Sequence, residues 1–367
     1  MQLKQKNKII ISAAGSRKTT FIVEDALSKE GISFIITYTN ENYKSIRQRI
    51  VDLNGTIPER IRVIRWLPFL LSHWIKPYRN LLAENIPRLQ GYFFPEVPAN
   101  HKEYLRRRRI TKDDILEYYF YGKQVVSESA SDLAFICNEK SEGKVIERLE
   151  TLCDNLYFDE VQDCAGWDLE LFPLLFQSSI NITLVGDNRQ RTYITNYSTK
   201  NSKYSGTNII EKFQEWHDDE LCTLESRTEC YRSNQIICSV ADLIYPEMEK
   251  TISKNEDVTG HDGVFLVNIA DVPNYIEEFE PQIMRYDKRT KVSYKNVINF
   301  GMSKGLTFER TLLFPTGKIK TALKGNDISE CGAKAKFYVA LTRAKYSVAI
   351  VYDGQTEIEG IVRYSYD

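Results

Sequence analysis

The residues best suited to phosphate chemistry lie close to the start of the chain. An apolar run at 9–11 leads through small residues to Lys18 and Thr19 and then to a helix-forming stretch. In such a loop, backbone N–H groups and the positive end of the following helix bind phosphates, Lys18 would reach the terminal phosphates, and Thr19 would hold Mg²⁺. Ser12 and Arg17 stand at the two glycine positions of the pattern G-x-x-x-x-G-K-[ST]. An ordinary strand-to-helix turn is therefore the alternative interpretation.

Two neighbouring carboxylates form the second candidate group. Asp159 and Glu160 follow an apolar stretch at 155–158, within the sequence D-E-V-Q-D. Magnesium-dependent phosphate hydrolysis needs one acid to hold the metal and another to orient or deprotonate water. A further strand predicted at 181–185 is followed by Gln190, which could contact a terminal phosphate, and by Tyr193, which could face a base. A simple turn at 186–187 is the alternative there.

Alternating strands and helices must position these groups. The pattern predicts a parallel sheet with right-handed crossovers, in which ligands bind at the carboxyl ends of the strands. The second strand is followed by Tyr38, Thr39 and Asn40. Their hydroxyls, amide and ring suit contact with a nucleic-acid backbone and a base. A loop that caps the next helix explains these residues equally well. The first elements are expected at 9–11, 20–29, 33–38 and 41–51, and a second alternating segment at 263–352 predicts another α/β domain from about residue 226.

Composition sets limits on the function. The 367 residues suffice for two domains. The chain has 49 Lys+Arg and 50 Asp+Glu, which gives a net charge of −1, so no overall positive charge indicates a nucleic-acid partner. This net charge is still compatible with a local basic groove. Seven cysteines occur without a C-x-x-C pair, which argues against a zinc site and a disulfide framework. The polar residues 1–8 do not resemble a signal segment, and no apolar run is long enough to cross a bilayer. We therefore expect a soluble, cytoplasmic protein.

The stretch at 55–150 is less regular. Aromatic and basic residues interleave at 60–66 and 73–78, and a basic run occupies 106–109. Such interleaving can form a track in which rings stack on bases and cations follow phosphates. A solvated helix face and tryptophans buried in the core are the alternative. The Pro and Gly residues between 86 and 98 indicate a small insertion in the first domain.

Seven short motifs follow one another along the chain, at 14–20, 37–40, 159–163, 186–193, 231–233, 303–308 and 338–345. Taken together and in this order, they resemble the motif set of UvrD/Rep-type superfamily 1 DNA helicases. This resemblance implies two RecA-like P-loop domains with parallel sheets at 1–225 and 226–367, a small insertion at about 55–150, and no large accessory domain in the second. It also implies ATP and Mg²⁺ as cofactors, single-stranded DNA as the partner, and work beside a nuclease or another subunit of a defence or repair complex.

The resemblance assigns a role to individual residues. Asp159 would hold the metal through water, Glu160 would be the catalytic base, and Gln190 would contact the γ-phosphate. Arg232 and Arg343 would be arginine fingers from the second domain. The nucleotide-binding set would be Gly15, Ser16, Arg17, Lys18, Thr19, Thr20 and the adenine-stacking Tyr231, and the nucleic-acid set would be Tyr38, Thr39, Asn40, Tyr193, Ser303 and Lys304.

Departures from the family pattern support a second hypothesis. Arg17 replaces a glycine, Thr195 an aromatic residue, Gly301 a histidine and Thr307 a glutamate. These changes would suit a nucleotide-responsive DNA-binding subunit with weak or no ATP hydrolysis, whereas retention of the phosphoryl-transfer residues favours an active enzyme. A kinase or small-molecule ATPase would have to explain the paired arginines and the D-E-x-Q-D group. The glutamine that reads adenine in the family has only Gln2 and Gln5 as candidates.

Overall fold

The structure is a computed structural model that describes residues 7–192 and 198–365. Gln2, Gln5, Tyr193 and Thr195 lie outside the described residues. The chain divides into two compact units. Of the described residues, unit 1 takes those within Met1–Ile10, Thr19–Asn188 and Tyr193–Glu225, and unit 2 takes those within Ile11–Lys18, Arg189–Thr192 and Ser226–Asp367. Residues 11–18, which hold the candidate phosphate loop, and the segment around Gln190 thus group with the carboxyl-terminal part of the chain.

The first sheet has the strand order β3-β2-β7-β8-β1-β9 within the described residues. Strand β2 pairs in parallel with β3 and β7, and β7 pairs in parallel with β8. All five residues of β2 and all five of β7 are buried, which explains their near-continuous apolar sequences. The strands are β1 (Lys8–Ser12), β2 (Ser33–Thr37), β3 (Ile61–Arg65), β7 (Asn155–Asp159), β8 (Asn181–Gly186) and β9 (Thr223–Arg227).

Helices bury both faces of this sheet. On one face, apolar residues of α1 (Lys18–Ser28) and α2 (Asn40–Asn54) pack on β1, β2 and β7. An aromatic cluster forms a second core, in which Trp66 contacts Phe69, Phe158 and Phe172. The helices that contribute to or flank this cluster are α3 (Trp66–Phe69), the π-helical turn Leu70–Ile75, α6 (Ala130–Lys140), α7 (Lys144–Glu150), α8 (Asp168–Phe176) and α9 (Ile209–Asp218).

The second sheet belongs to unit 2 and has the order β14-β13-β15-β16-β12-β17 among the described residues. All its pairings are parallel. The strands are β12 (Gly263–Val267), β13 (Gln282–Arg285), β14 (Ile298–Asn299), β15 (Phe308–Phe314), β16 (Ala344–Val351) and β17 (Ile361–Arg363). The helices are α10 (Gln235–Asp242), α11 (Val272–Phe279), α12 (Gly317–Lys324) and α13 (Lys334–Leu341), and β10 (Glu229–Cys230) pairs with β11 (Ile252–Ser253) in a separate two-stranded sheet.

The two six-stranded sheets share one topology. When the strands of each are numbered 1 to 6 along the chain, both read 3-2-4-5-1-6. The predicted α/β class with parallel sheets, consistent with RecA-like domains, is confirmed. The segment at 275–285, taken as one member of the second alternating pattern, contains the end of α11 and the whole of β13.

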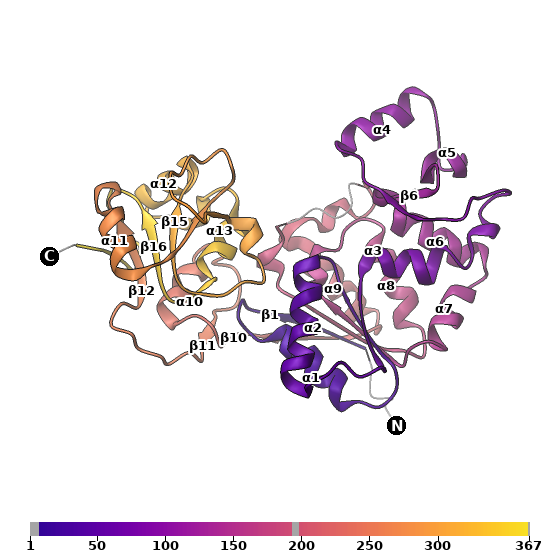
Figure 1. The fold of residues 1–367 in the computed structure, drawn as a ribbon, viewed down its shortest axis with the longest axis horizontal. Helices are drawn as coiled ribbons and strands as arrows, with labels where there is room; N and C mark the ends of the chain where they lie inside the picture. The colour runs from indigo at the N-terminus through magenta and orange to yellow at the C-terminus, as the bar shows by residue number, and fades with distance from the viewer. Residues whose placement is uncertain (1–6, 193–197, 366–367) are drawn as a thin grey trace. The chain divides into compact units, whose positions relative to one another are not determined.

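The insertion in unit 1 has its own small elements. Strands β4 (Gly91–Phe93), β6 (Gln124–Val126) and β5 (Phe120–Tyr121) form a three-stranded sheet, with α4 (Pro98–Arg107) and α5 (Ile115–Tyr119) beside it. Figure 1 shows α4 and α5 standing out from the main sheet of this unit. Trp66 and Trp74 are at most 1% exposed, so the hypothesis that they stack on bases is wrong and the core alternative holds. Across the described residues, no helix has the length and apolar character needed to cross a membrane.

Candidate functional site

The loop between β1 and α1 has the backbone conformation expected for close approach to phosphate. Gly15 and Arg17 have φ values of 76° and 61°, in the left-handed region that favours glycine. Lys18 begins α1, and its Nζ donates to the carbonyl oxygens of Ser12 at 3.3 Å and Ala13 at 3.1 Å. The lysine side chain therefore folds back over the loop.

Two hydroxyls of this loop fit an anionic ligand. Ser12 Oγ and Ser16 Oγ are shielded from solvent, and neither has a hydrogen-bond partner among the described residues. A buried hydroxyl without a partner is unfavourable, and phosphate oxygens accept from such donors. Together with Lys18 and the start of α1, these hydroxyls suit the phosphates of a nucleotide.

The candidate metal site lies at the carboxyl end of β7 in unit 1. Thr19 Oγ1 donates to Asp159 Oδ2 at 3.1 Å, and Asp159 is 2% exposed. A threonine hydroxyl and a carboxylate are oxygen ligands of the kind that Mg²⁺ prefers. The two residues are 140 positions apart in sequence, so the sheet brings together the two metal ligands that the motifs predict.

Glu160 follows Asp159 directly and is held by a neighbouring amide. Its φ is 62°, which turns the chain sharply at the end of the strand. Gln162 Nε2 donates to the Glu160 carboxylate, and Gln162 Oε1 accepts from the backbone N–H of Asp187 at 3.0 Å. A Cβ atom at Gly186 would collide with this amide oxygen. Our sequence reasoning assigned no role to Gln162, although its place in D-E-V-Q-D was the available signal.

The two arginines singled out in the sequence lie close together in unit 2. Arg343 is 2% exposed, and its Nη2 donates to Gln190 Oε1 at 3.2 Å. The Nε of Arg343 donates to the carbonyl oxygen of Val339 at 3.0 Å. Arg232 Nη1 donates to the carbonyl oxygen of Thr342 at 2.9 Å. Both guanidinium groups are therefore anchored on carbonyls in the last turn of α13 and its cap, the negative end of that helix.

Arg17 and Tyr231 form a cation–π contact in unit 2. The guanidinium carbon of Arg17 lies 4.3 Å from the ring centroid of Tyr231. The Tyr231 N–H donates to the carbonyl oxygen of Gly15 at 2.9 Å, and a Cβ atom at Gly15 would come within 2.8 Å of Cys230 Sγ. The side chain at the family glycine position thus projects onto the tyrosine assigned to adenine stacking.

A buried polar network that the sequence did not reveal lies next to this contact. Arg189 Nη1 and Asp242 Oδ1 are 3.3 Å apart, and the Arg189 guanidinium lies over the ring of Tyr338 at 5.1 Å. Tyr338 Oη in turn accepts from the Ala14 N–H of the phosphate loop at 3.5 Å. Burial raises the pKa of Asp242, whereas hydrogen bonds from Cys238 and from the Ser233 backbone lower that of the Cys230 thiol.

The proposed nucleic-acid residues have internal contacts. The Tyr38 hydroxyl donates to Asp168 at 2.6 Å, and Thr39 is the N-cap of α2, accepting from the Asn42 N–H at 3.1 Å. Thr39 thus takes the capping role weighed as an alternative, and Asn40 is the exposed first residue of α2. Ser303 Oγ donates to the Phe300 carbonyl oxygen, and Lys304 is 7% exposed. Thr20 lies in the first turn of α1.

Comparisons with known proteins give structural similarity only. No family model and no curated protein sequence matches the chain. The structure of Arterivirus nonstructural protein 10, a helicase, is similar with a TM-score of 0.48 and 14% sequence identity, and the match covers 95% of this chain and 61% of that chain. The structure of its complex with DNA has the same TM-score, identity and coverage of this chain, and the match covers 62% of that chain. The PRRSV helicase is similar with a TM-score of 0.46 and 15% sequence identity, and the match covers 95% of this chain and 52% of that chain. The chain spans about three fifths of the arterivirus protein's length.

Proposed function

We propose that this chain hydrolyses ATP and uses the energy to move along single-stranded DNA, as UvrD/Rep-type superfamily 1 helicases do. The observation that carries the proposal is the hydrogen bond between Thr19 and Asp159, with Glu160 directly after. It joins the hydroxyl after the phosphate-loop lysine to the acid that ends a parallel strand. This pairing is the arrangement by which P-loop proteins hold the metal of a nucleoside triphosphate.

The roles of the side chains follow from their chemistry. Lys18 and the loop hydroxyls bind the phosphates, and Thr19 and Asp159 hold Mg²⁺, which when bound neutralises the charge that develops on the phosphate oxygens. Glu160 accepts a proton from the attacking water. Gln162 fixes the orientation of the Glu160 carboxylate, which limits the rearrangement needed for proton transfer.

Arg232, Arg343 and Gln190 serve the same nucleotide in our proposal. Guanidinium groups stabilise the charge that spreads over the transferred phosphoryl group. The contact of Arg343 with Gln190 supports a coupled response of the two side chains to the terminal phosphate. Tyr38, Thr39, Asn40, Tyr193, Ser303 and Lys304 form the DNA track, and a nuclease or another subunit of a defence or repair complex assists the compact motor.

A second candidate function rests on the contact between Arg17 and Tyr231. The guanidinium group lies on the ring where the family stacks adenine, so it would compete with the base. Such competition would weaken nucleotide binding and slow hydrolysis. The chain would then act as a nucleotide-responsive DNA-binding subunit.

ATP hydrolysis measured with and without single-stranded DNA distinguishes the two functions. The motor proposal expects turnover that DNA stimulates and that Lys18→Ala abolishes. Lys44→Ala, which changes an exposed lysine of α2, is the matched control and should behave as the wild type. Nucleotide binding without turnover, with or without DNA, would overturn the motor proposal in favour of the second candidate.

A further inference from the structure

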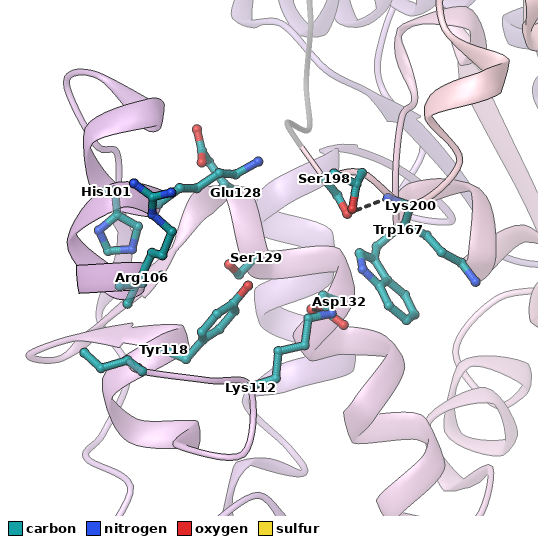
Figure 2. A pocket seen from close by; sticks show the side chains of 14 residues that line it. His101, Arg106, Lys112, Tyr118, Glu128, Ser129, Asp132, Trp167, Ser198 and Lys200 are labelled. Atoms are coloured by element: carbon teal, nitrogen blue, oxygen red, sulfur yellow. Dashed lines mark hydrogen bonds and ion pairs between the residues drawn. The ribbon is translucent and has the colours of Figure 1, made fainter. Parts of the chain in front are cut away.

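A cavity of about 690 Å³ lies in unit 1, outside all the helicase-like motifs. Figure 2 shows Arg106 on one side of it and Trp167 and Lys200 on the other, with Glu128 and Asp132 between them. Arg106 comes from α4 of the insertion, and Trp167 immediately precedes α8. The volume is in the range of small-molecule sites, about 300–1,000 Å³.

The lining carries more positive than negative charge. The lining has an excess of two positive charges, because it contains four cations, Lys102, Arg106, Lys112 and Lys200, and two carboxylates, Glu128 and Asp132. Lys112 pairs with Asp132 at 2.6 Å. The pKa of His101 is lowered by burial, so its ring adds no charge near pH 7. Lys200 pairs with Glu170, which lies outside the lining, at 3.4 Å, so the excess rests mainly on the side chains of α4.

An aromatic platform stands among these cations. Trp167 is half-buried, and the ammonium groups of Lys112 and Lys200 lie 4.5 Å and 5.2 Å from its ring centroid. Lysine side chains are flexible, so a planar ligand can displace an ammonium group from the indole face. Stacking of a base on an aromatic ring and pairing of its phosphate with nearby cations is a recurrent mode of nucleotide recognition.

We propose that this pocket binds a nucleoside monophosphate group, with the phosphate on Arg106, Lys102 and Lys200 and the base on the indole of Trp167. A terminal phosphate carries about −1.5 to −2 charges at pH 7, opposite in sign to the excess charge of the lining. Two sources present this chemistry, a free mononucleotide and the phosphorylated end of a strand. The inference is independent of the proposed ATP site, because none of the lining residues belongs to it.

Tryptophan fluorescence reports binding directly. Trp66, Trp74 and Trp216 are each at most 1% exposed, so ligand-dependent quenching arises mainly at Trp167. We would titrate AMP, adenosine, and a short single-stranded DNA with either a 5′-phosphate or a 5′-hydroxyl. The Lys18→Ala variant is used in parallel, because binding that persists there does not come from the proposed ATP site. Loss of hydrolysis and loss of this binding are thus separate results.

The expected result is saturable quenching that requires the phosphate and survives Lys18→Ala. The double variant Arg106→Gln/Lys200→Gln should raise Kd at least about tenfold, since charge-assisted contacts to phosphate are lost. The matched double variant Arg107→Gln/Lys203→Gln removes two nearby cations that do not line the pocket and should leave Kd unchanged.

The ligand series identifies the source and can refute the site. Quenching by AMP assigns a free nucleotide, and quenching by 5′-phosphorylated DNA alone assigns a strand end; either supports the proposal. Three results would overturn it. The first is that adenosine binds as tightly as AMP and the two DNA ends bind equally. The second is equal weakening by the two double variants, and the third is that no ligand gives saturable quenching.

Discussion

The two sheets have the same strand order, yet their candidate functional residues stand at opposite ends of strands and helices. In unit 1, Asp159 ends the fourth strand of the sheet, and Thr19 lies at the amino end of α1. In unit 2, Arg343 directly precedes the fifth strand and contacts the last turn of α13. Anions are stabilised at helix amino ends and cations at carboxyl ends. The same topology thus offers two electrostatically opposite positions, and each unit carries its candidate residues at one of them.

This comparison also explains how each group is held in place. Asp159 and Glu160 are oriented by donors, the hydroxyl of Thr19 and the amide of Gln162. Arg343 is oriented by acceptors, mainly backbone carbonyls and the Gln190 amide oxygen. Backbone acceptors cannot be changed by substitution. We therefore expect the unit 1 site to be the easier one to dismantle.

Glu160→Gln tests the unit 1 site most severely. Removing the base should reduce kcat for ATP by about 10²–10⁴-fold, while nucleotide binding is retained because the amide has the same shape. Glu211→Gln, an exposed carboxylate of α9, is the control. A variant that still hydrolyses ATP at half the wild-type rate would remove Glu160 from the mechanism.

Arg343→Lys tests the unit 2 site at the next level of effect. Lysine keeps the charge but loses the planar fork that binds Val339 and Gln190, so we expect kcat to fall by about 10²-fold. The melting temperature, recorded alongside, separates this effect from unfolding. Arg285→Lys changes another arginine of the same unit and should have little effect. If kcat falls equally in both variants, the special position of Arg343 is refuted.

Arg17→Gly addresses the point at which the chain departs from the helicase pattern. Glycine accepts the φ of 61° and removes the guanidinium from Tyr231, so nucleotide affinity should rise by about two- to fivefold. Arg17→Lys, which retains a cation, should stay near the wild-type affinity. Weaker binding by the glycine variant would make Arg17 a ligand contact and not a competitor of the base.

Acid stability provides the smallest test and rests on one half-buried histidine in each unit, His73 and His261. Burial lowers the pKa of His73 in unit 1 and of His261 in unit 2 to about 4. Between pH 6.5 and 4 the unfolded chain binds protons that the folded chain does not, so the free energy of unfolding should fall as pH falls. His261→Phe keeps the stacking with Phe265 and Phe279, and its acid-induced loss should be smaller than that of the wild type.

His217→Phe serves as the histidine control for this comparison. Chemical denaturation at pH 7 and pH 4.5 gives the two free energies for each variant. The loss on acidification should be reduced in His261→Phe relative to both the wild type and His217→Phe. An unchanged loss in His261→Phe would show that His261 does not contribute to the acid sensitivity of unit 2.

The sequence predicts the strands and the groups at their ends, because short-range chemistry dictates these parts of the structure. The apolar runs at 155–158 and 181–185 and the alternation around them predict parallel strands, because strands buried on both faces must be continuously apolar. The order of Lys18, Thr19, Asp159 and Glu160 along the chain predicts which groups meet at the strand ends. The meeting of Thr19 and Asp159 is observed directly.

The rest was decided by tertiary structure, since it depends on contacts between residues far apart in sequence. Trp66 and Trp74 have the same local pattern as a DNA-binding track, and only long-range packing buries them, in the case of Trp66 against Phe158 of β7 and Phe172 of α8. The sequence shows that Arg17 is not glycine, but not that it lies on Tyr231, which is 214 positions away. The charged pocket at Trp167 joins four separate segments of the chain, at 101–118, 128–132, 167 and 198–200, and has no signature in any one of them. Local sequence determined the strands and the chemistry at their ends, whereas long-range packing determined which side chains remain available to a ligand.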